Sequence, residues 1–178
     1  MKLKIPSAKS QLVAVEAPQF TVPDGQVLSL YIPKNIGELK AAWNILKDYT
    51  GRMAPNPESA LQDLDEITDV LKYHSSDSGY LIFTAVDEGG KPVAVAPAEI
   101  VPLSDVTERK PFQGMSIGLI YQIGHTPRIS NNDVDFSVAS SLYEAVASTM
   151  PRLLAKKDGW AGTVTESRKE GPELEAIL

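Results

Sequence analysis

Two apolar runs joined by a short polar turn constrain the fold of this chain most strongly. Tyr80–Val86 (YLIFTAV) and Val93–Val101 (VAVAPAEIV) are rich in residues that favour β-strands. Between them, Asp87–Lys91 (DEGGK) supplies the Asp and Gly residues that a tight turn requires. The pattern predicts an antiparallel β-hairpin, and Pro97 in the second run predicts a bulge or a sheet edge at that point.

Two helices are predicted on the N-terminal side of this hairpin. Asn35 is a capping residue, and Glu38 stands three positions later as its capping-box partner. Gly51 is expected to end this first helix, and Asn56–Pro57 is expected to open the second. The apolar residues of both helices recur at helical spacing: Ile36, Leu39, Trp43, Leu46 and Tyr49 in the first, and Leu61, Leu64, Ile67, Val70 and Leu71 in the second.

The remaining apolar runs predict further strands and one long helix. The strands are expected at Gln26–Ile32, Met115–Gln122 and Ala161–Glu166, and the helix from near Phe136 into Leu153–Lys157. Pro151 is expected to kink or split that helix. The element order is therefore β-α-α-β-β-β-α-β, which predicts an α+β (mixed α/β) fold with a mostly antiparallel central sheet rather than a doubly wound sheet.

Composition narrows the functional classes. The 178 residues allow one ordinary domain, and a net charge of −6 disfavours binding to nucleic acid. The chain has no cysteine for disulfides, thiolate catalysis or metal binding, and no ligand spacing links His74 to His125. No apolar run reaches membrane-spanning length, and the first residues lack a signal-peptide pattern. We therefore expect a soluble, cytoplasmic protein that makes no membrane contact.

A loop rich in small residues follows the Met115–Gln122 strand and leads into the long helix. From Asp133 to Val146 its sequence reads DVDFSVASSLYEAV. Backbone amides at the start of a helix can converge on an anion when the side chains around them are small. Ser137 and Ala139 meet that condition, so the loop is a candidate anion-binding site.

The element order and this loop together resemble the GNAT superfamily of acyl-CoA-dependent N-acyltransferases. The resemblance covers residues 26–167. The family signature at the start of the long helix is Arg/Gln-x-x-Gly-x-Gly/Ala. On this chain the basic position falls on Val134, the first glycine on Ser137 and the Gly/Ala position on Ala139, so Ala139 matches and the other two do not.

The resemblance implies that acetyl-CoA or another acyl-CoA is the acyl donor. The residues that it implies for CoA binding are Gln122, Ile123, Arg128, Ser137, Val138 and Ala139. Arg128 would supply the missing positive charge if the loop folds back. Asp133 and Asp135 would repel an anion at this helix end, although acidic residues there also act as helix caps.

Transfer of an acyl group to an amine requires a general base, an oxyanion donor and an acid for the thiolate. Glu99 on the second hairpin strand and His125 after the Met115–Gln122 strand are the candidate bases, and Tyr121 is the candidate acid. Each has a structural alternative. Glu99 would be a carboxylate at a solvated sheet edge, His125 an exposed or hydrogen-bonded loop residue, and Tyr121 a packing residue.

A second hypothesis is a catalytically inactive GNAT-like protein with a structural or assembly role, for example a phage virion component. It is motivated by the mismatched signature and the acidic loop. A further motive is that the family places another helix and two strands where this chain has only residues 167–178, so the sheet would be shortened or completed by a partner. Residues 1–25 form an extended N-terminal arm that crosses its own domain or docks on a partner to form an oligomer, and residues 168–178 form a tail.

Overall fold

The computed structural model describes residues 15–53, 56, 58, 61, 62, 65, 68, 80–102, 114–121, 123–126, 136–154 and 159–165. The strands are β1 (Gln19–Thr21), β2 (Val27–Tyr31), β3 (Tyr80–Val86), β4 (Pro92–Pro102), β5 (Ser116–Ile120), β6 (Gly124–His125) and β7 (Trp160–Thr165). The helices are α1 (Ile36–Met53) and α3 (Phe136–Leu153). Within the predicted second helix, residues 58, 61, 62, 65 and 68 are helical.

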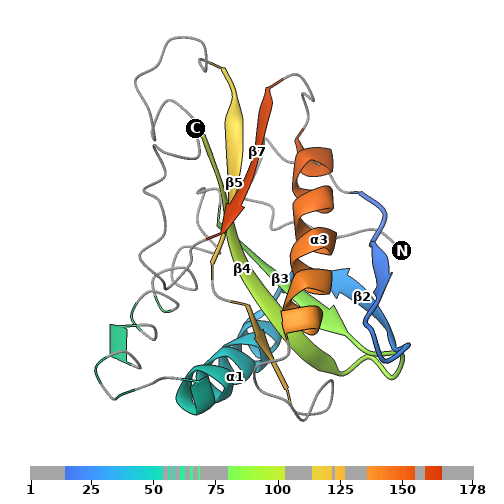
Figure 1. The fold of residues 1–178 in the computed structure, drawn as a ribbon, viewed down its shortest axis with the longest axis vertical. Coiled ribbons are helices and arrows are strands. Elements are labelled where there is room, and N and C mark those ends of the chain that lie inside the picture. The colour runs from blue at the N-terminus through green and yellow to red at the C-terminus, as the bar shows by residue number, and fades with distance from the viewer. Residues whose placement is uncertain are drawn as a thin grey trace.

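The described strands form one sheet in the order β1-β2-β3-β4-β5-β7, and β6 pairs with β4 beyond the end of β5. Neighbouring strands are antiparallel, except that β5 and β7 are parallel because α3 connects them. Helix α1 packs on one face of the sheet and α3 on the other (Figure 1). The predicted α+β class and mostly antiparallel sheet are confirmed.

The predicted hairpin is present and joins β3 to β4. The Asp87 amide donates to the Lys91 carbonyl at 3.0 Å, and the Gly90 amide donates to the Asp87 carbonyl at 2.9 Å. Gly90 has a φ of 77°, a left-handed conformation that glycine adopts without steric cost. The pairing register shifts between Ala85 and Val86, so the two strands are not in simple hairpin alignment.

Pro97 lies inside the sheet, because β4 runs between β3 and β5. The expected sheet edge at this residue is therefore wrong. The expected bulge is on the facing strand. Pairing passes from Ala98↔Ile120 to Val95↔Gly124, which is three steps along β4 but four along its partner. A strand residue without an N–H is tolerated here because the ladder is already interrupted opposite it.

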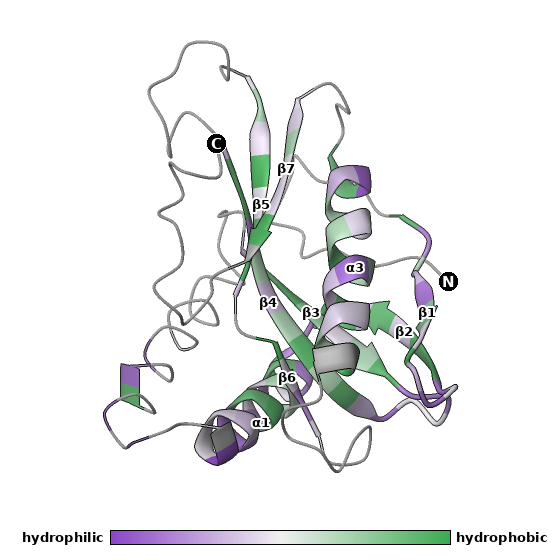
Figure 2. Cartoon of the chain, in the orientation of Figure 1, coloured by the Kyte–Doolittle hydropathy of each residue, from purple (hydrophilic) through white to green (hydrophobic). Residues whose placement is uncertain are grey.

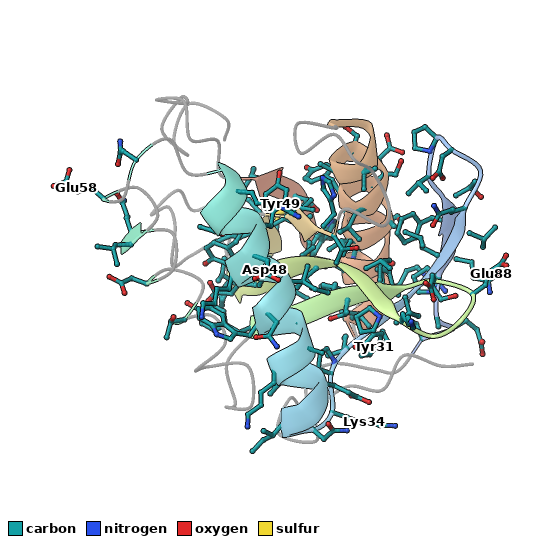
Figure 3. The ribbon with its side chains drawn as sticks, turned by 90° about the horizontal axis from the view of Figure 1, so that it is seen from below. Tyr31, Lys34, Asp48, Tyr49, Glu58 and Glu88 are labelled. Atoms are coloured by element: carbon teal, nitrogen blue, oxygen red, sulfur yellow. The ribbon has the colours of Figure 1, made fainter. Side chains whose placement is uncertain are left out.

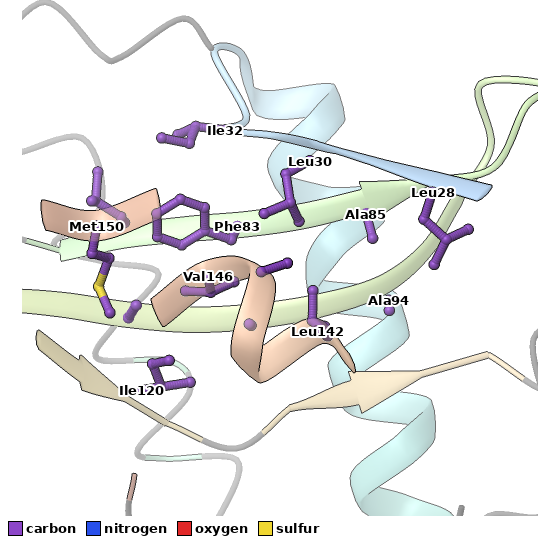
Figure 4. Packing of buried hydrophobic residues seen from close by; sticks show 14 of the residues in the cluster. Leu28, Leu30, Ile32, Phe83, Ala85, Ala94, Ile120, Leu142, Val146 and Met150 are labelled. Atoms are coloured by element: carbon purple, nitrogen blue, oxygen red, sulfur yellow. The ribbon is translucent and has the colours of Figure 1, made fainter. Parts of the chain in front are cut away.

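The larger core lies between α3 and the sheet. Leu142, Val146 and Met150 recur along one stripe of α3 and pack with Leu30 of β2 and Phe83 of β3 (Figure 4). All five side chains are buried. Burial of an apolar side chain of this size contributes about 1.5–3 kcal/mol before conformational entropy is subtracted. Figure 2 shows the matching apolar colouring of β3 and β4, the central strands.

A smaller core lies under α1 on the opposite face. Ala42, Ile45 and Leu46 of α1 pack against Ile82 of β3 and Val95 of β4. Because successive strand residues point to opposite faces, the same two strands serve both cores. Figure 3 shows α1 crossing the sheet, with Lys34 before its start and Tyr49 towards its other end.

The N-terminal cap of α1 is confirmed. Asn35 Oδ1 accepts a hydrogen bond from the Glu38 amide at 2.9 Å, and the Glu38 carboxylate accepts one from the Lys34 amide at 2.8 Å. These bonds use backbone donors that have no acceptor inside the helix. Glu38 reaches back one residue further than a standard capping box requires.

Three expectations for the first two helices are wrong. Ile36 and Leu61 are 70% and 63% exposed, so neither belongs to a buried stripe. Ile36 is the first helical residue, ahead of the part of α1 that crosses the sheet. Gly51 does not end α1, which continues to Met53. The φ of Gly51 is not positive, and the next residue, Arg52, donates a hydrogen bond to the His125 carbonyl at 2.8 Å.

Helix α3 is not split by its proline. Pro151 lies in the last turn, and α3 ends at Leu153 rather than continuing towards Lys157. Few residues follow the proline here, so the distortion that it causes is confined to the last turn of α3. No helix in the described part of the chain is both long and apolar enough to cross a membrane.

The N-terminal segment contains a strand that the sequence did not predict. β1 pairs with β2, and Phe20 and Val22 pack against the α3-side core. The described residues 15–25 therefore lie across their own domain, while residues 1–14 fall outside the described part. Docking of the arm on a partner, and with it an oligomer, stays a prediction.

The start of β7 gives a first prediction. A Cβ at Gly159 would stand 2.6 Å from the Gly114 carbonyl oxygen, a backbone atom that cannot rotate away. Gly159→Ala should lower the free energy of unfolding by about 1–3 kcal/mol. The matched control is Gly51→Ala, where no atom lies within 4 Å and the helix should gain about 0.5–1 kcal/mol. Urea unfolding followed by circular dichroism measures both, and a Gly159→Ala variant as stable as wild type would contradict the packing.

Candidate active site

The strands β5 and β7 pair over the whole described length of β7. Their parallel pairing runs from Ser116↔Trp160 to Ile120↔Thr165. The facing chain then passes through the bulge at 121–123 into β6, which among the described strands pairs with β4 alone. The second edge of β6 therefore faces no strand among the described residues, which on β7 reach as far as Thr165.

A second feature of this region is the start of α3, which lies near β6. α3 begins at Phe136 and contacts β6 (Figure 1). The first-turn amides of an α-helix have no acceptor within the helix, and the helix dipole adds partial positive charge there. The first turn of α3 contains no acidic residue. Asp133 and Asp135 lie outside the described residues, as does the rest of the loop before α3.

The predicted CoA-binding residues fall into two groups. Ser137, Val138 and Ala139 are in the first turns of α3. The Val138 side chain is 3% exposed and belongs to the core, so Val138 can offer a ligand its amide but not its side chain. Ile123 lies in the bulge before β6 and packs against the α3-side core. Gln122 and Arg128 lie outside the described residues, and their predicted roles are untested.

Two of the three predicted catalytic residues are brought together. The Tyr121 hydroxyl donates a hydrogen bond to Glu99 Oε2 at 2.7 Å. Glu99 is on β4 opposite Leu119, and Tyr121 follows β5 directly. The Tyr121 amide donates to the Pro97 carbonyl at 2.8 Å, which fixes the backbone at the start of the bulge. Both side chains are half-buried, so Glu99 is not at a fully solvated sheet edge.

Tyr80 joins this pair, and sequence reasoning missed it. The Tyr80 and Tyr121 rings are stacked, with centroids 6.4 Å apart and an interplanar angle of 21°. Tyr80 is directly opposite Glu99 in the β3–β4 register. Counting back from the hairpin turn without the shift at Ala85/Val86 would place Tyr80 opposite Ala98 and on the other face. The position of Tyr80 opposite Glu99 therefore depends on the register shift, which the residue pattern does not reveal.

Tyr121 is held in its protonated form. Burial, followed by the hydrogen bond and negative charge of Glu99, raises the pKa of Tyr121 above its usual value of 10.0. A tyrosine with a raised pKa is a weaker acid, whereas a thiol ordinarily titrates at about 8.5. Tyr121 is therefore better suited to orient Glu99 than to donate a proton to a thiolate.

His125 stands apart from Glu99 and Tyr121. It is 1% exposed, and its ring lies against Tyr49 of α1 with centroids 5.1 Å apart. Its Nδ1 is 3.2 Å from the Thr126 carbonyl, and its Nε2 has no hydrogen-bond partner in the described part of the chain. A Cβ at Gly124 would stand 3.2–3.3 Å from α1 side-chain atoms, which shows how closely α1 approaches β6. His125 is thus a buried contact residue rather than an exposed loop histidine.

The raised pKa of Tyr121 generates a pH prediction. Below pH 10 the hydroxyl is protonated in the folded and unfolded states alike. Above it the unfolded chain releases a proton that the folded chain retains, so stability falls as pH rises. Tyr121→Phe should make the fall between pH 10 and 11 shallower, and Glu99→Gln should act in the same direction. Chemical unfolding at a series of pH values measures this, and equal slopes for wild type and Tyr121→Phe would contradict the assignment.

Comparison with known proteins finds similarity in structure alone. No family model and no curated protein matches the sequence. A GCN5-related N-acetyltransferase from Ralstonia eutropha JMP134 is 16% identical with a TM-score of 0.51, and the match covers 84% of this chain and 90% of that one. A possible acetyltransferase from Clostridium difficile 630 is 7% identical with a TM-score of 0.51, over 84% and 86% of the two chains.

Identities this low establish the fold and not the activity. The features that the comparisons share with the structure are a mixed α+β architecture and a curled, mostly antiparallel sheet. The predicted resemblance is therefore confirmed at the level of architecture: this chain has the fold of the GCN5-related N-acetyltransferase (GNAT) superfamily.

Proposed function

We propose that this protein transfers an acyl group from an acyl-CoA to an amine. The observation that carries the proposal is that β6 has β4 as its single strand partner among the described residues and lies against α3. A strand edge and a helix N-terminus are complementary to the two ends of one extended ligand. Similarity of fold to N-acetyltransferases supports the same class of reaction.

The second edge of β6 suits the pantetheine arm of CoA. That arm is narrow and carries amide groups, which can pair with backbone as an added strand does. The phosphates of CoA would then meet the first-turn amides of α3, at Phe136, Ser137 and Val138.

Glu99 is the candidate general base. The acceptor ammonium first gives a proton to the Glu99 carboxylate, because only the neutral amine has a lone pair for attack. The amine nitrogen then attacks the thioester carbonyl, a C–N bond forms and the C–S bond breaks. The proton that the nitrogen loses as the amide forms passes to the departing CoA thiolate, which leaves as the thiol. Tyr121 holds the Glu99 carboxylate through its 2.7 Å hydrogen bond and so positions the base.

The first test is binding of acetyl-CoA by isothermal titration calorimetry. Wild type should bind with a dissociation constant in the micromolar range. Ser137→Glu adds a negative charge to the first turn of α3 and should weaken binding about tenfold or more, because like charges meet at short range. Ser148→Glu is the matched control, since it adds the same charge to the exposed face of α3 far from its start.

If Ser137→Glu binds acetyl-CoA as tightly as wild type, the CoA phosphates do not bind at the start of α3. No heat at millimolar acetyl-CoA would overturn the proposed function. That outcome would leave the catalytically inactive assembly role as the better hypothesis.

The second test separates the base from the binding site. Glu99→Gln keeps the shape of the side chain and removes its charge, so release of CoA thiol in the presence of small primary amines should fall about 10²–10⁴-fold. Affinity for acetyl-CoA should stay unchanged, because Glu99 does not contact the first turn of α3. Tyr121→Phe should cost less than Glu99→Gln. A Glu99→Gln enzyme with the wild-type rate would exclude Glu99 as the base.

A further inference from the structure

The geometry points to a binding site for an organic cation, an alkylammonium group, formed by Tyr80, Glu99 and Tyr121. These side chains come from three adjacent stretches of the sheet: the start of β3, the second half of β4 and the residue after β5. The inference names the chemical class of the acceptor, and in that respect it rests on the proposed function. The cation site itself can be tested without acyl-CoA.

Strand register places the three side chains together. Tyr80 is opposite Glu99 on β3–β4, and Glu99 is opposite Leu119, two residues before Tyr121. Residues that face each other across a sheet, or are offset by two, share one face. Tyr80 and Tyr121 both pack at the border of the α1-side core, which confirms that this face is the one that α1 covers in part.

The charge on Glu99 lacks a protein counter-ion in the described part of the chain. Its hydrogen bond there comes from a neutral phenol, the Tyr121 hydroxyl, and no described Lys or Arg pairs with it. A half-buried carboxylate loses part of its hydration, and a neutral donor compensates this less than a cation does. A positively charged ligand would complete the arrangement.

The two rings favour the same kind of ligand. Aromatic faces carry partial negative charge and attract cations. The Tyr80 and Tyr121 rings are nearly parallel at 21°, and both residues are half-buried. Two ring faces and one carboxylate therefore contribute negative potential to a single place.

These groups suit an organic cation better than a metal ion. Hard cations such as Mg²⁺ and Ca²⁺ take about six or more oxygen ligands and hold their water strongly. Glu99 offers one carboxylate, and the ring faces cannot replace inner-sphere oxygens. An alkylammonium is weakly hydrated on its carbon side, so it can rest against the rings while its charge faces Glu99.

This site would serve the proposed reaction directly. An amine acceptor is cationic before it loses its proton, and the same carboxylate that attracts it is the candidate base. Tyr80 would then be a specificity-determining residue, because it contributes a ring and no proton transfer. Cationic amines should react in preference to neutral amines of the same size.

The test uses the full-length protein, with ¹³C-labelled tyrosine rings followed by NMR. The probes are choline and its neutral isostere 3,3-dimethylbutan-1-ol, at constant ionic strength and without acyl-CoA. Choline should shift the Tyr80 and Tyr121 ring signals in a saturable manner, and the neutral isostere should not. Tyr31, on β2, is the internal control and should not shift.

Variants separate the contribution of the Glu99 charge from that of the Tyr80 ring. Glu99→Gln should weaken choline binding about tenfold, and Tyr80→Leu should weaken it several-fold, while Tyr80→Phe, which keeps the ring face, should bind as wild type. Circular dichroism of each variant checks that it is folded. Rescue by Tyr80→Phe separates loss of the ring from loss of the hydroxyl.

Three results would overturn the inference: equal binding of choline and its neutral isostere, unchanged binding in Glu99→Gln, or no shift of the Tyr80 and Tyr121 signals. Displacement of choline by stoichiometric Mg²⁺ would also count against it, because it would indicate a metal site. If acetyl-CoA binds but choline does not, the inference fails and the proposed function stands. If choline binds but acetyl-CoA does not, the cation site stands without the transferase.

Discussion

The interrupted ladder opposite Pro97 is the constraint on which the rest of the site depends. Pro97 has no N–H to give, and the strand facing it does not continue in unbroken register. The facing chain inserts one residue, donates the Tyr121 amide to the Pro97 carbonyl, and resumes as β6. That bulge separates β5, which pairs with β7, from β6, which pairs with β4 alone among the described strands. It also brings Tyr121 to Glu99, so one local defect accounts for both the turn into β6 and the candidate catalytic pair.

The two proposed ligands would reach this point from opposite faces of the sheet. The first-turn amides of α3 lie on the α3 side and favour an anion, whereas Glu99, Tyr80 and Tyr121 lie on the α1 side and favour a cation. An acyl donor held on one side and an amine on the other would meet at the bulge between β5 and β6.

Local signals predicted much of the fold, and long-range register did not. The hairpin around Gly90 and the cap at Asn35 follow from neighbouring residues, and both are confirmed. α1 continues past Gly51 to Met53, and Arg52 in its last turn donates to the His125 carbonyl, a contact far apart in sequence that neighbouring residues do not predict. Glu99 and Tyr121 could be named from their positions, but their contact could not. The place of Tyr80 in the site could not be predicted from the sequence, because the register shift between Ala85 and Val86 decides whether Tyr80 shares a face with Glu99.

The most direct test of the central claim is an NMR titration of ¹⁵N-labelled protein with acetyl-CoA, followed at backbone amides. The account predicts saturable shifts along segment 121–125, at the end of β7 near Thr165 and in the first turn of α3, with little change in β1 and β2. The region between β6 and the start of α3 would then be a binding site. Shifts confined to residues outside these three segments, or no shift at saturating ligand, would contradict it.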